Sequence, residues 1–294
     1  MEPNEKTFTS QANFHLAGIV PVAGNRVDLN FPFPNVMMPV ADNYTLLDAA
    51  IVECAYAGCD TIWIICNDDT APLLRHRIGD YIEDPSYYYY NTSANREHRK
   101  RIPIFWIPQH PKDRDKRDCL SWSVIYGSLV VFKTAAKISK WVIPDKYYVS
   151  FPYGLADPRE VITMKSKISS QKNFYIVSEG RTVQDNIYTS FTFGKDEFIK
   201  YRRNVRKGTG KWKGDYGNME LLPIEERWSA RFFELKDVYI DLNLDDANVL
   251  EVENYFNITN WKEYQNYMRS DYSDKIVKPP KDLFSYKEFH GVAT

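Results

Sequence analysis

A glycine and an arginine follow the first apolar segment of the chain. Residues 15 to 24 read HLAGIVPVAG, and Arg26 stands two positions after Gly24. Backbone N–H groups in a glycine-containing turn after a strand can bind a phosphate, and an arginine adds positive charge. Two plainer interpretations stay open, in which Gly24 only permits a tight turn and Arg26 forms a surface ion pair. This stretch therefore indicates a candidate phosphate site.

Three polar side chains stand beside later apolar segments. Gln109 directly follows the segment IPIFWIP, and Ser121 and Ser123 lie near the start of an apolar, helix-patterned run. Open α/β sheets bind ligands at the carboxyl ends of their strands, so Gln109 is a candidate ligand-binding residue. The two serines are candidates for base or phosphate contacts, although serine near a helix start is commonly only a cap.

The cysteines and histidines do not have the spacing of a metal site. Cys54, Cys59, Cys66 and Cys119 form no C-x-x-C pair, and the five histidines show neither H-x-E nor H-x-x-x-H spacing. Three of the cysteines stand in apolar segments, where the side chain acts as a small hydrophobe. We expect all four to be reduced and buried.

One segment carries a strong local positive charge. Residues 200 to 214, KYRRNVRKGTGKWKG, hold seven lysines and arginines, no acid, and two aromatic side chains. Such a segment between Lys200 and Lys213 could bind a phosphorylated substrate, a polyanion or an acidic protein surface. The alternative is a solvated helix end whose charge is balanced by the acidic stretch from 234 to 253.

The elements that must position these residues alternate along the first half of the chain. The hydrophobic patterns predict strands at 15–22, 61–66, 102–108 and 146–151, with helices at 44–58, about 70–82 and about 119–141. Parallel strands need crossover connections, which are right-handed. This order predicts a Rossmann-like α/β core with a mostly parallel sheet and helices on both faces.

The pattern is looser after residue 158. It predicts strands at 173–178, 187–193 and 238–244, the second in an antiparallel or edge position, and a helix at 195–208. We expect an N-terminal tail (1–13), one domain (14–270) and an extended C-terminal tail (271–294). Within the domain, 14–160 would form the core, about 161–235 a substrate-side extension, and 236–270 a return to the core.

The composition of the chain limits the class of protein to which it can belong. The chain has 294 residues, is 44% hydrophobic and carries a formal net charge of −1. This is typical of a globular protein, and the overall charge gives no reason to expect nucleic acid or a membrane as partner. No apolar stretch approaches a membrane-spanning length, and the first residues contain no apolar signal region. We therefore predict a cytoplasmic protein.

Four segments together resemble the sugar nucleotidyltransferase family, which has a glycosyltransferase-A-like α/β fold. AGIVPVAGNR resembles the family's opening strand and phosphate loop, and FPNVMMPVADNYTLLDAAIVECAYAGCDTIWIIC resembles its Pro-Lys segment, first helix and second strand. IFWIPQ with CLSWSVIYGSL resembles the third strand and the next helix, and NITNWKEYQNYM resembles the final strand end and short helix. The chain also resembles bacteriophage members of this family, which implies host cytoplasm or a virion.

The resemblance assigns roles to particular residues. It places Ala23, Gly24 and Asn25 in a phosphate loop, Arg26 on a triphosphate, and Gln109 and Ser121 on the nucleotide. The family binds Mg²⁺ through two aspartates at separate strand ends; here Asp157 lies three residues beyond Gly154, and Asp241, Asp245 and Asp246 offer an alternative cluster for the second aspartate. Asp157 with Asp241 is therefore the candidate Mg²⁺ site. Asn35 stands where the family has a lysine, and an amide supplies no positive charge. Asn257 stands where the family has its second metal-binding aspartate. Asp157 and Asp241 can equally be ordinary cap or turn residues.

Two hypotheses about function stay open at this point. In the first, the protein binds a nucleotide or sugar nucleotide and transfers a nucleotidyl group from an NTP to a sugar phosphate with Mg²⁺. In the second, it is a catalytically silent module with a structural role, for example in a phage particle. Its tyrosine-rich loop at 87–90 and its C-terminal tail would then contact protein partners.

Overall fold

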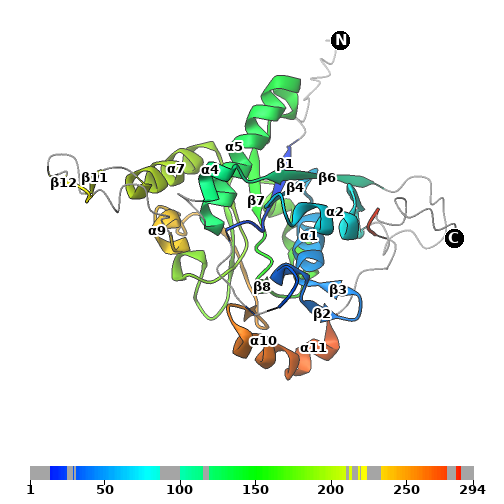
Figure 1. Cartoon of the computed structure of the whole chain (residues 1–294). Coiled ribbons are helices and arrows are strands. Elements are labelled where there is room, and N and C mark those ends of the chain that lie inside the picture. The colour runs from blue at the N-terminus through cyan, green and yellow to red at the C-terminus, as the bar shows by residue number, and fades with distance from the viewer. Residues whose placement is uncertain are drawn as a thin grey trace, which may run out of the picture.

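A computed structural model describes residues 14–24, 29, 31–86, 100–114, 119–209, 212–213, 218, 220–223, 233–276 and 283–285. Its main feature is an eight-stranded sheet with the strand order β13-β9-β10-β7-β1-β4-β6-β5 (Figure 1). These strands are β1 (Leu16–Pro21), β4 (Thr61–Cys66), β5 (Tyr81–Glu83), β6 (Arg101–Pro108), β7 (Lys146–Val149), β9 (Phe174–Val177), β10 (Phe191–Phe193) and β13 (Asn248–Glu251).

The centre of the sheet is parallel. Strand β1 pairs in parallel with β4 and β7, and β4 pairs in parallel with β6. Strands β5 and β10 run antiparallel to their neighbours, which confirms the antiparallel placement expected for 187–193. The mostly parallel α/β sheet predicted from the alternating pattern is therefore confirmed.

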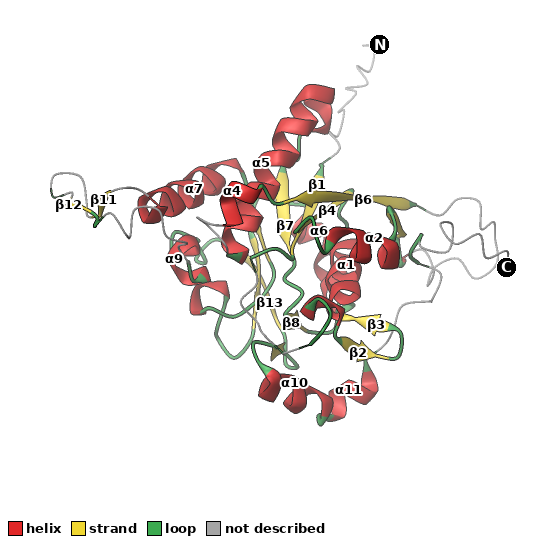
Figure 2. Cartoon of the chain, in the orientation of Figure 1, coloured by secondary structure: helices red, strands yellow, loops and turns green. Residues whose placement is uncertain are grey.

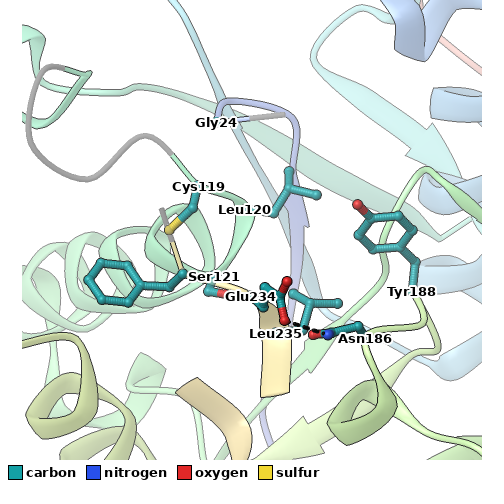
Figure 3. Close-up of a pocket in the computed structure, with 9 residues that line it drawn as sticks. Gly24, Cys119, Leu120, Ser121, Asn186, Tyr188, Glu234 and Leu235 are labelled. Carbon is teal, nitrogen blue, oxygen red and sulfur yellow. Dashed lines mark hydrogen bonds between the residues drawn. The ribbon is translucent and has the colours of Figure 1, made fainter. Parts of the chain in front are cut away.

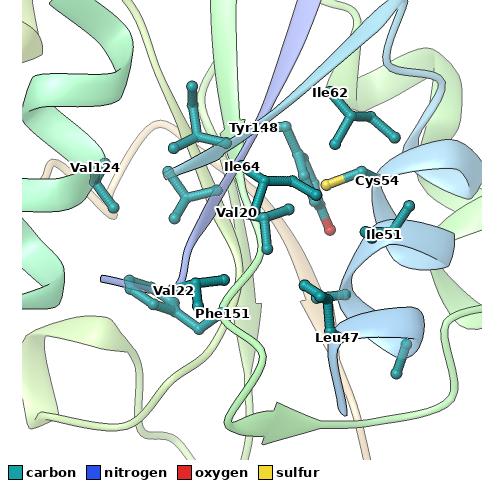
Figure 4. Close-up of a cluster of buried hydrophobic side chains, with 14 of the residues drawn as sticks. Val20, Val22, Leu47, Ile51, Cys54, Ile62, Ile64, Val124, Tyr148 and Phe151 are labelled. Atoms are coloured by element: carbon teal, nitrogen blue, oxygen red, sulfur yellow. The ribbon is translucent and has the colours of Figure 1, made fainter. Parts of the chain in front are cut away.

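Two long helices cover opposite faces of this sheet. They are α1 (Leu46–Ala57) and α5 (Leu120–Ile138). A Cβ atom on Gly18 of β1 would lie 3.0 Å from Cys54 Sγ of α1, and one on Gly127 of α5 would lie 2.5 Å from Ile65 Cδ1 of β4. Both helices thus pack closely on the strands, and the buried aliphatic side chains between them form the core (Figure 4). Figure 2 shows the strands in the middle of the molecule with helices to either side.

The shorter elements complete the architecture. The other helices are α2 (Ala71–Ile78), α4 (Pro111–Arg114), α6 (Lys165–Ile168), α7 (Lys195–Thr209), α9 (Leu235–Tyr239), α10 (Trp261–Met268) and α11 (Asp271–Lys275). Short strands pair outside the main sheet: β2 (Pro39–Ala41) with β3 (Tyr44–Thr45), β8 (Gly154–Leu155) with β14 (Phe256–Asn257), and β11 (Trp212–Lys213) with β12 (Glu220–Leu221). Single 3₁₀ turns lie at Asn35–Met37, Lys140–Val142, Glu160–Met164 and Val183–Asp185.

Helix α1 shows why the local sequence is a reliable guide in the first half. Thr45 accepts the N–H of Asp48, and Asp48 accepts the N–H of Thr45, which forms a capping box at the helix start. Gly58 ends the helix in the left-handed conformation with φ 87°. Both signals are local, so the predicted helix at 44–58 closely matches α1.

Two predicted elements were wrong in extent or type. The helix predicted at 70–82 ends at Ile78, because Gly79 turns the chain into the edge strand β5. The strand predicted at 238–244 is the end of α9 and a turn. The side-chain amide of Gln184 donates to three carbonyl oxygens there, those of Tyr239, Ile240 and Leu242, and holds the segment away from the sheet.

The predicted extension contributes strands to the same sheet. Strands β9 and β10 lie between β7 and the later strand β13, and α7 packs against α5 and α9. The C-terminal tail was expected to be extended, but it begins with the short helix α11. Phe284 then forms an antiparallel bridge with Ile82 of β5. The N-terminal tail and the tyrosine run at 87–90 lie outside the described residues.

Candidate functional site

The turn after β1 is fixed to two neighbouring elements at the carboxyl edge of the sheet. The N–H groups of Val22 and Ala23 both donate to the Ile65 carbonyl of β4, at 2.8 Å each. The hydroxyl of Ser123 on α5 donates to the Ala23 carbonyl at 2.6 Å. These bonds hold the turn against the first helical turn of α5.

Gly24 is required where the turn meets α5. It adopts φ 78°, and a Cβ atom there would lie 2.6 Å from the carbonyl carbon of Cys119. A side chain would therefore combine an unfavourable backbone conformation with a steric clash. Glycine lets the backbone of the turn approach the start of the helix.

A pocket of about 350 Å³ opens beside this contact (Figure 3). The turn, the start of α5, the segment before β10 and the start of α9 all contribute to its wall. Its lining residues are Gly24, Cys119, Leu120, Ser121, Asn186, Tyr188, Phe233, Glu234 and Leu235. Of the residues predicted to bind a nucleotide, Gly24 and Ser121 thus line one pocket.

The two sides of the pocket differ in charge. Helix α5 begins without a side-chain cap hydrogen bond and without an acid in its first turn, so its N-terminal end carries partial positive charge. On the α9 side, Asn186 Nδ2 donates to Glu234 Oε2 at 2.9 Å. Hydrogen bonds from Lys236 and Asn186 lower the pKa of Glu234, so its carboxylate is ionised at neutral pH. An anionic group is therefore favoured at α5, and a hydroxyl donor at Glu234.

Two buried polar side chains near this edge lack well-formed hydrogen bonds within the described residues. Ser121 is fully buried, and its hydroxyl makes no bond of good geometry there, although it lies near enough to the Tyr239 hydroxyl to offset part of the rise that burial causes in the pKa of Tyr239. Gln109 follows β6 directly and is also fully buried, with neither its amide oxygen nor its amide nitrogen paired. The Gln109 backbone is held, because its N–H donates to the Cys66 carbonyl at 2.8 Å. An unpaired buried amide is costly, which makes Gln109 a candidate ligand-binding group.

Gln109 and the Gly24 turn lie at the same edge of the sheet. Strands β1, β4 and β6 are parallel neighbours, and both residues follow the carboxyl ends of their strands. Gln109 does not belong to the lining of the pocket itself. Asn35 begins the 3₁₀ turn at Asn35–Met37, and its carbonyl accepts the N–H of Met38. Asn25 and Arg26 lie outside the described residues.

The two aspartates predicted to bind metal have different partners. Asp157 accepts three hydrogen bonds from the Arg159 guanidinium, whereas Asp241 accepts one from Asn204 of α7 at 2.9 Å. Burial and, after it, the charge of Asp157 raise the pKa of Tyr272 on α11, an element that Figure 1 shows well separated from α7. This arrangement does not fit a metal ion held by both carboxylates. The described residues also contain no group of three or more His, Cys, Asp or Glu suited to a metal.

Asn257 lies close to the sheet edge instead. It pairs with Gly154 in the β8–β14 ribbon, and its side-chain oxygen accepts the Tyr188 N–H at 2.9 Å. A Cβ atom on Gly154 would lie 2.0 Å from the Tyr188 carbonyl oxygen. Asn257 therefore positions Tyr188, which lines the pocket.

Sequence reasoning missed the pocket residues on the far side, Asn186, Tyr188, Phe233 and Glu234. One usable signal was the segment ELKD at 234–237, which forms a capping box at the start of α9. Nothing local shows that this helix start faces α5 across a pocket, because the two are more than a hundred residues apart in sequence.

The four cysteines are buried, as predicted, and none of them forms a disulfide within the described residues. No helix within the described residues has the length and apolar character to cross a membrane.

The eight-stranded, mostly parallel sheet with helices on both faces is an α/β fold, and its likeness to solved structures shows that it is of the nucleotidyltransferase type. Neither a known family model nor a curated protein sequence matches the chain. Among solved structures, a UTP-bound UGPase from Acinetobacter baumannii has a TM-score of 0.52 and 12% identity, over 94% of this chain and 97% of that chain. A UDP-glucose pyrophosphorylase complexed with UDP-glucose has a TM-score of 0.50 and 10% identity, over 89% and 99%. At such identities the likeness shows a shared fold.

Proposed function

We propose that this protein binds a nucleotide or sugar nucleotide at the carboxyl edge of its sheet. The observation that carries the proposal is Gln109, a fully buried amide at the same sheet edge as the Gly24 turn, whose donor and acceptor have no partner among the described residues. A nucleobase edge offers a matching acceptor and donor, and such a pair would remove the cost of the unpaired amide. The solved structures with this fold support the choice, since one is UTP-bound and another is complexed with UDP-glucose.

The pocket offers complementary chemistry for the rest of such a ligand. The uncapped first turn of α5 suits a phosphate, and Gly24 lets the turn after β1 lie directly against that helix start. Glu234 and Asn186 suit hydroxyl groups, since the carboxylate accepts and the amide both donates and accepts. Tyr188 and Phe233 add aromatic surface. A molecule with an anionic part and a polyhydroxylated part satisfies both sides.

The finer proposal is transfer of a nucleotidyl group from an NTP to a sugar phosphate. Two differences from the pattern of residues that the resemblance implies affect this finer proposal. Asn35 supplies no positive charge at a position where the resemblance implies one, and the carboxylates of Asp157 and Asp241 do not fit a shared Mg²⁺. Mg²⁺ commonly binds through substrate phosphates and one or two carboxylates, so it can still arrive with a triphosphate. We therefore propose binding as the primary activity and test turnover separately.

Thermal unfolding with each of the four NTPs and with UDP-glucose, with and without Mg²⁺, tests the proposal. A ligand at ~100 times its Kd adds about 2.7 kcal/mol of stability and raises the melting temperature. The control is Gln109→Met, which conserves volume and removes both unpaired atoms, and should abolish the shift. Pyrophosphate release with sugar 1-phosphates measures turnover. No shift with any nucleotide would refute the proposal and favour a catalytically silent structural module.

A further inference from the structure

The outward side of α7 is a basic surface made of Lys200, Arg202, Arg203 and Arg206. All four side chains are exposed, while Tyr201 and Val205 on the opposite side of the helix are buried. The four cations lie within the seven residues from Lys200 to Arg206, whose six steps of ~1.5 Å correspond to about 9 Å of helix axis. Figure 1 shows α7 at the margin of the molecule, with the β11–β12 ribbon beyond it. The surface is therefore convex and accessible.

None of these four cations forms an ion pair within the part of the chain that the structure describes. The sequence analysis considered the acidic stretch 234–253 as a source of balancing charge, but three of its acids have other partners. Asp246 pairs with Lys172, Glu234 pairs with Lys236, and Asp241 accepts from Asn204. With a formal net charge of −1 for the whole chain, the positive potential is local to this helix.

The composition of the surface favours one class of partner. A protein interface usually has an apolar centre, and the only large exposed hydrophobic residue on the described part of α7 is Ile199, 48% exposed. A small phosphorylated ligand would need a concave site, and the described pocket lies elsewhere. Three arginines, whose planar groups donate two parallel hydrogen bonds, match a row of phosphates. Over about 9 Å, each strand of a duplex presents about three phosphates.

We propose that the basic surface of α7 binds the phosphodiester backbone of a nucleic acid, independently of base sequence. This site is separate from the nucleotide pocket, whose lining comes from the Gly24 turn, the start of α5, the segment before β10 and the start of α9, with no residue of α7. Binding to phosphates releases counterions, so the affinity must fall steeply with salt.

The test is fluorescence anisotropy of the full chain with a labelled 20-nucleotide oligo-dT and a 20-base-pair duplex at 50 to 200 mM NaCl. We compare two double variants, each removing two exposed charges four residues apart on a helix: Arg202→Ala/Arg206→Ala on α7 and Lys133→Ala/Lys137→Ala on α5. The α7 pair should weaken binding at least tenfold at 50 mM NaCl. It should also reduce the slope of log K against log salt by about 1.4 to 1.8, from about 0.7 to 0.9 per phosphate contact. The α5 pair should change neither.

Three results would overturn the proposal: no binding at 50 mM NaCl, equal weakening by both pairs, or equally strong binding of poly-L-glutamate, which would identify an acidic protein partner. A stronger response to oligo-dT than to duplex, or the reverse, identifies the form of nucleic acid. Because the α7 pair lies outside the pocket, its melting temperature and its NTP-induced shift should match the wild type. Failure of nucleic acid binding thus leaves the nucleotide proposal unaffected.

Discussion

Two buried polar regions of this protein differ in whether their side chains are hydrogen-bonded. Beneath α1, the Glu53 carboxyl accepts from the Tyr148 phenol at 2.8 Å and from the Ser190 hydroxyl at 2.5 Å. At the sheet edge, the Gln109 amide has no partner for either of its polar atoms. Both side chains are buried, Glu53 being 6% exposed and Gln109 fully enclosed.

We interpret this difference as a difference in role: the region beneath α1 is structural, and the region at the sheet edge is the proposed binding site. The hydrogen-bonded Glu53 connects α1 to strand β7 through Tyr148 and to the segment before β10 through Ser190. These bonds specify how the helix lies on the sheet. An unpaired buried group costs free energy in the absence of a ligand and recovers it when a ligand binds. Under the proposed function, the buried polar groups beneath α1 serve the fold, and the unpaired Gln109 amide at the carboxyl edge is available to a ligand.

The largest effect is expected at the sheet edge from Gly24→Ala. The new Cβ atom clashes with the Cys119 backbone and the left-handed φ is unfavourable, so the free energy of unfolding should fall by about 3 kcal/mol. Urea unfolding measures this, and the NTP-induced thermal shift should disappear. The matched control is Gly180→Ala, which has φ 72° but no neighbour within 4 Å of the added atom. It should cost only about 1 to 2 kcal/mol. Equal losses in both variants would contradict a steric role for Gly24.

Beneath α1, the next largest effect is expected from Tyr148→Phe. This change removes a donor from the Glu53 carboxyl while keeping the ring, so unfolding should become easier by about 1 to 3 kcal/mol. Nucleotide-induced shifts should persist, because the change lies outside the site. Tyr201→Phe is the control, since the Tyr201 hydroxyl is buried without a hydrogen bond. A comparable loss for Tyr201→Phe would show that the pairing of Glu53 is not the reason.

Gln109→Met should have a smaller effect on stability, of the opposite sign. Removing two unpaired polar atoms at nearly constant volume should raise the free energy of unfolding by about 1 kcal/mol. The same variant should lose nucleotide binding, so stability and binding change in opposite directions. Urea unfolding and isothermal titration with the best NTP measure the two quantities. If Gln109→Met were destabilised and still bound nucleotide, the different roles assigned to the two buried regions would be contradicted.

The smallest effect is a pH dependence of the interior region. Burial raises the pKa of Glu53 above its usual 4.5, and hydrogen bonds from Ser190 and Tyr148 offset part of that rise. As the pH rises above about 4.5, the unfolded chain loses this proton first, so stability falls until the folded carboxyl also ionises. Urea unfolding from pH 4 to 8 should show a steeper decline for wild type than for Glu53→Gln. Parallel curves would mean that Glu53 has the same pKa in both states.

Much of the central sheet could be predicted from the sequence because its signals are local. The run TIWIIC at 61–66 is strand β4 itself, and Thr45 and Gly58 define the ends of α1. The segment VYIDLNL was predicted wrongly for the opposite reason. Its β-branched and aromatic residues favour a strand, but Gln184, more than fifty residues earlier, binds its carbonyl groups and holds it as a helix end and turn.

For the candidate site, the sequence by itself determined the alternation of elements and hence the edge where Gly24 and Gln109 lie. Parallel strands connected by helices bring their carboxyl ends to one side, which follows from chain connectivity. Only the tertiary structure decided that Asn186, Tyr188 and Glu234 face the start of α5, and that Asp157 and Asp241 have separate partners. It also decided that the Gln109 amide is unpaired. The physical reason is that pockets and buried hydrogen bonds depend on contacts between distant segments, which no local pattern of side chains specifies.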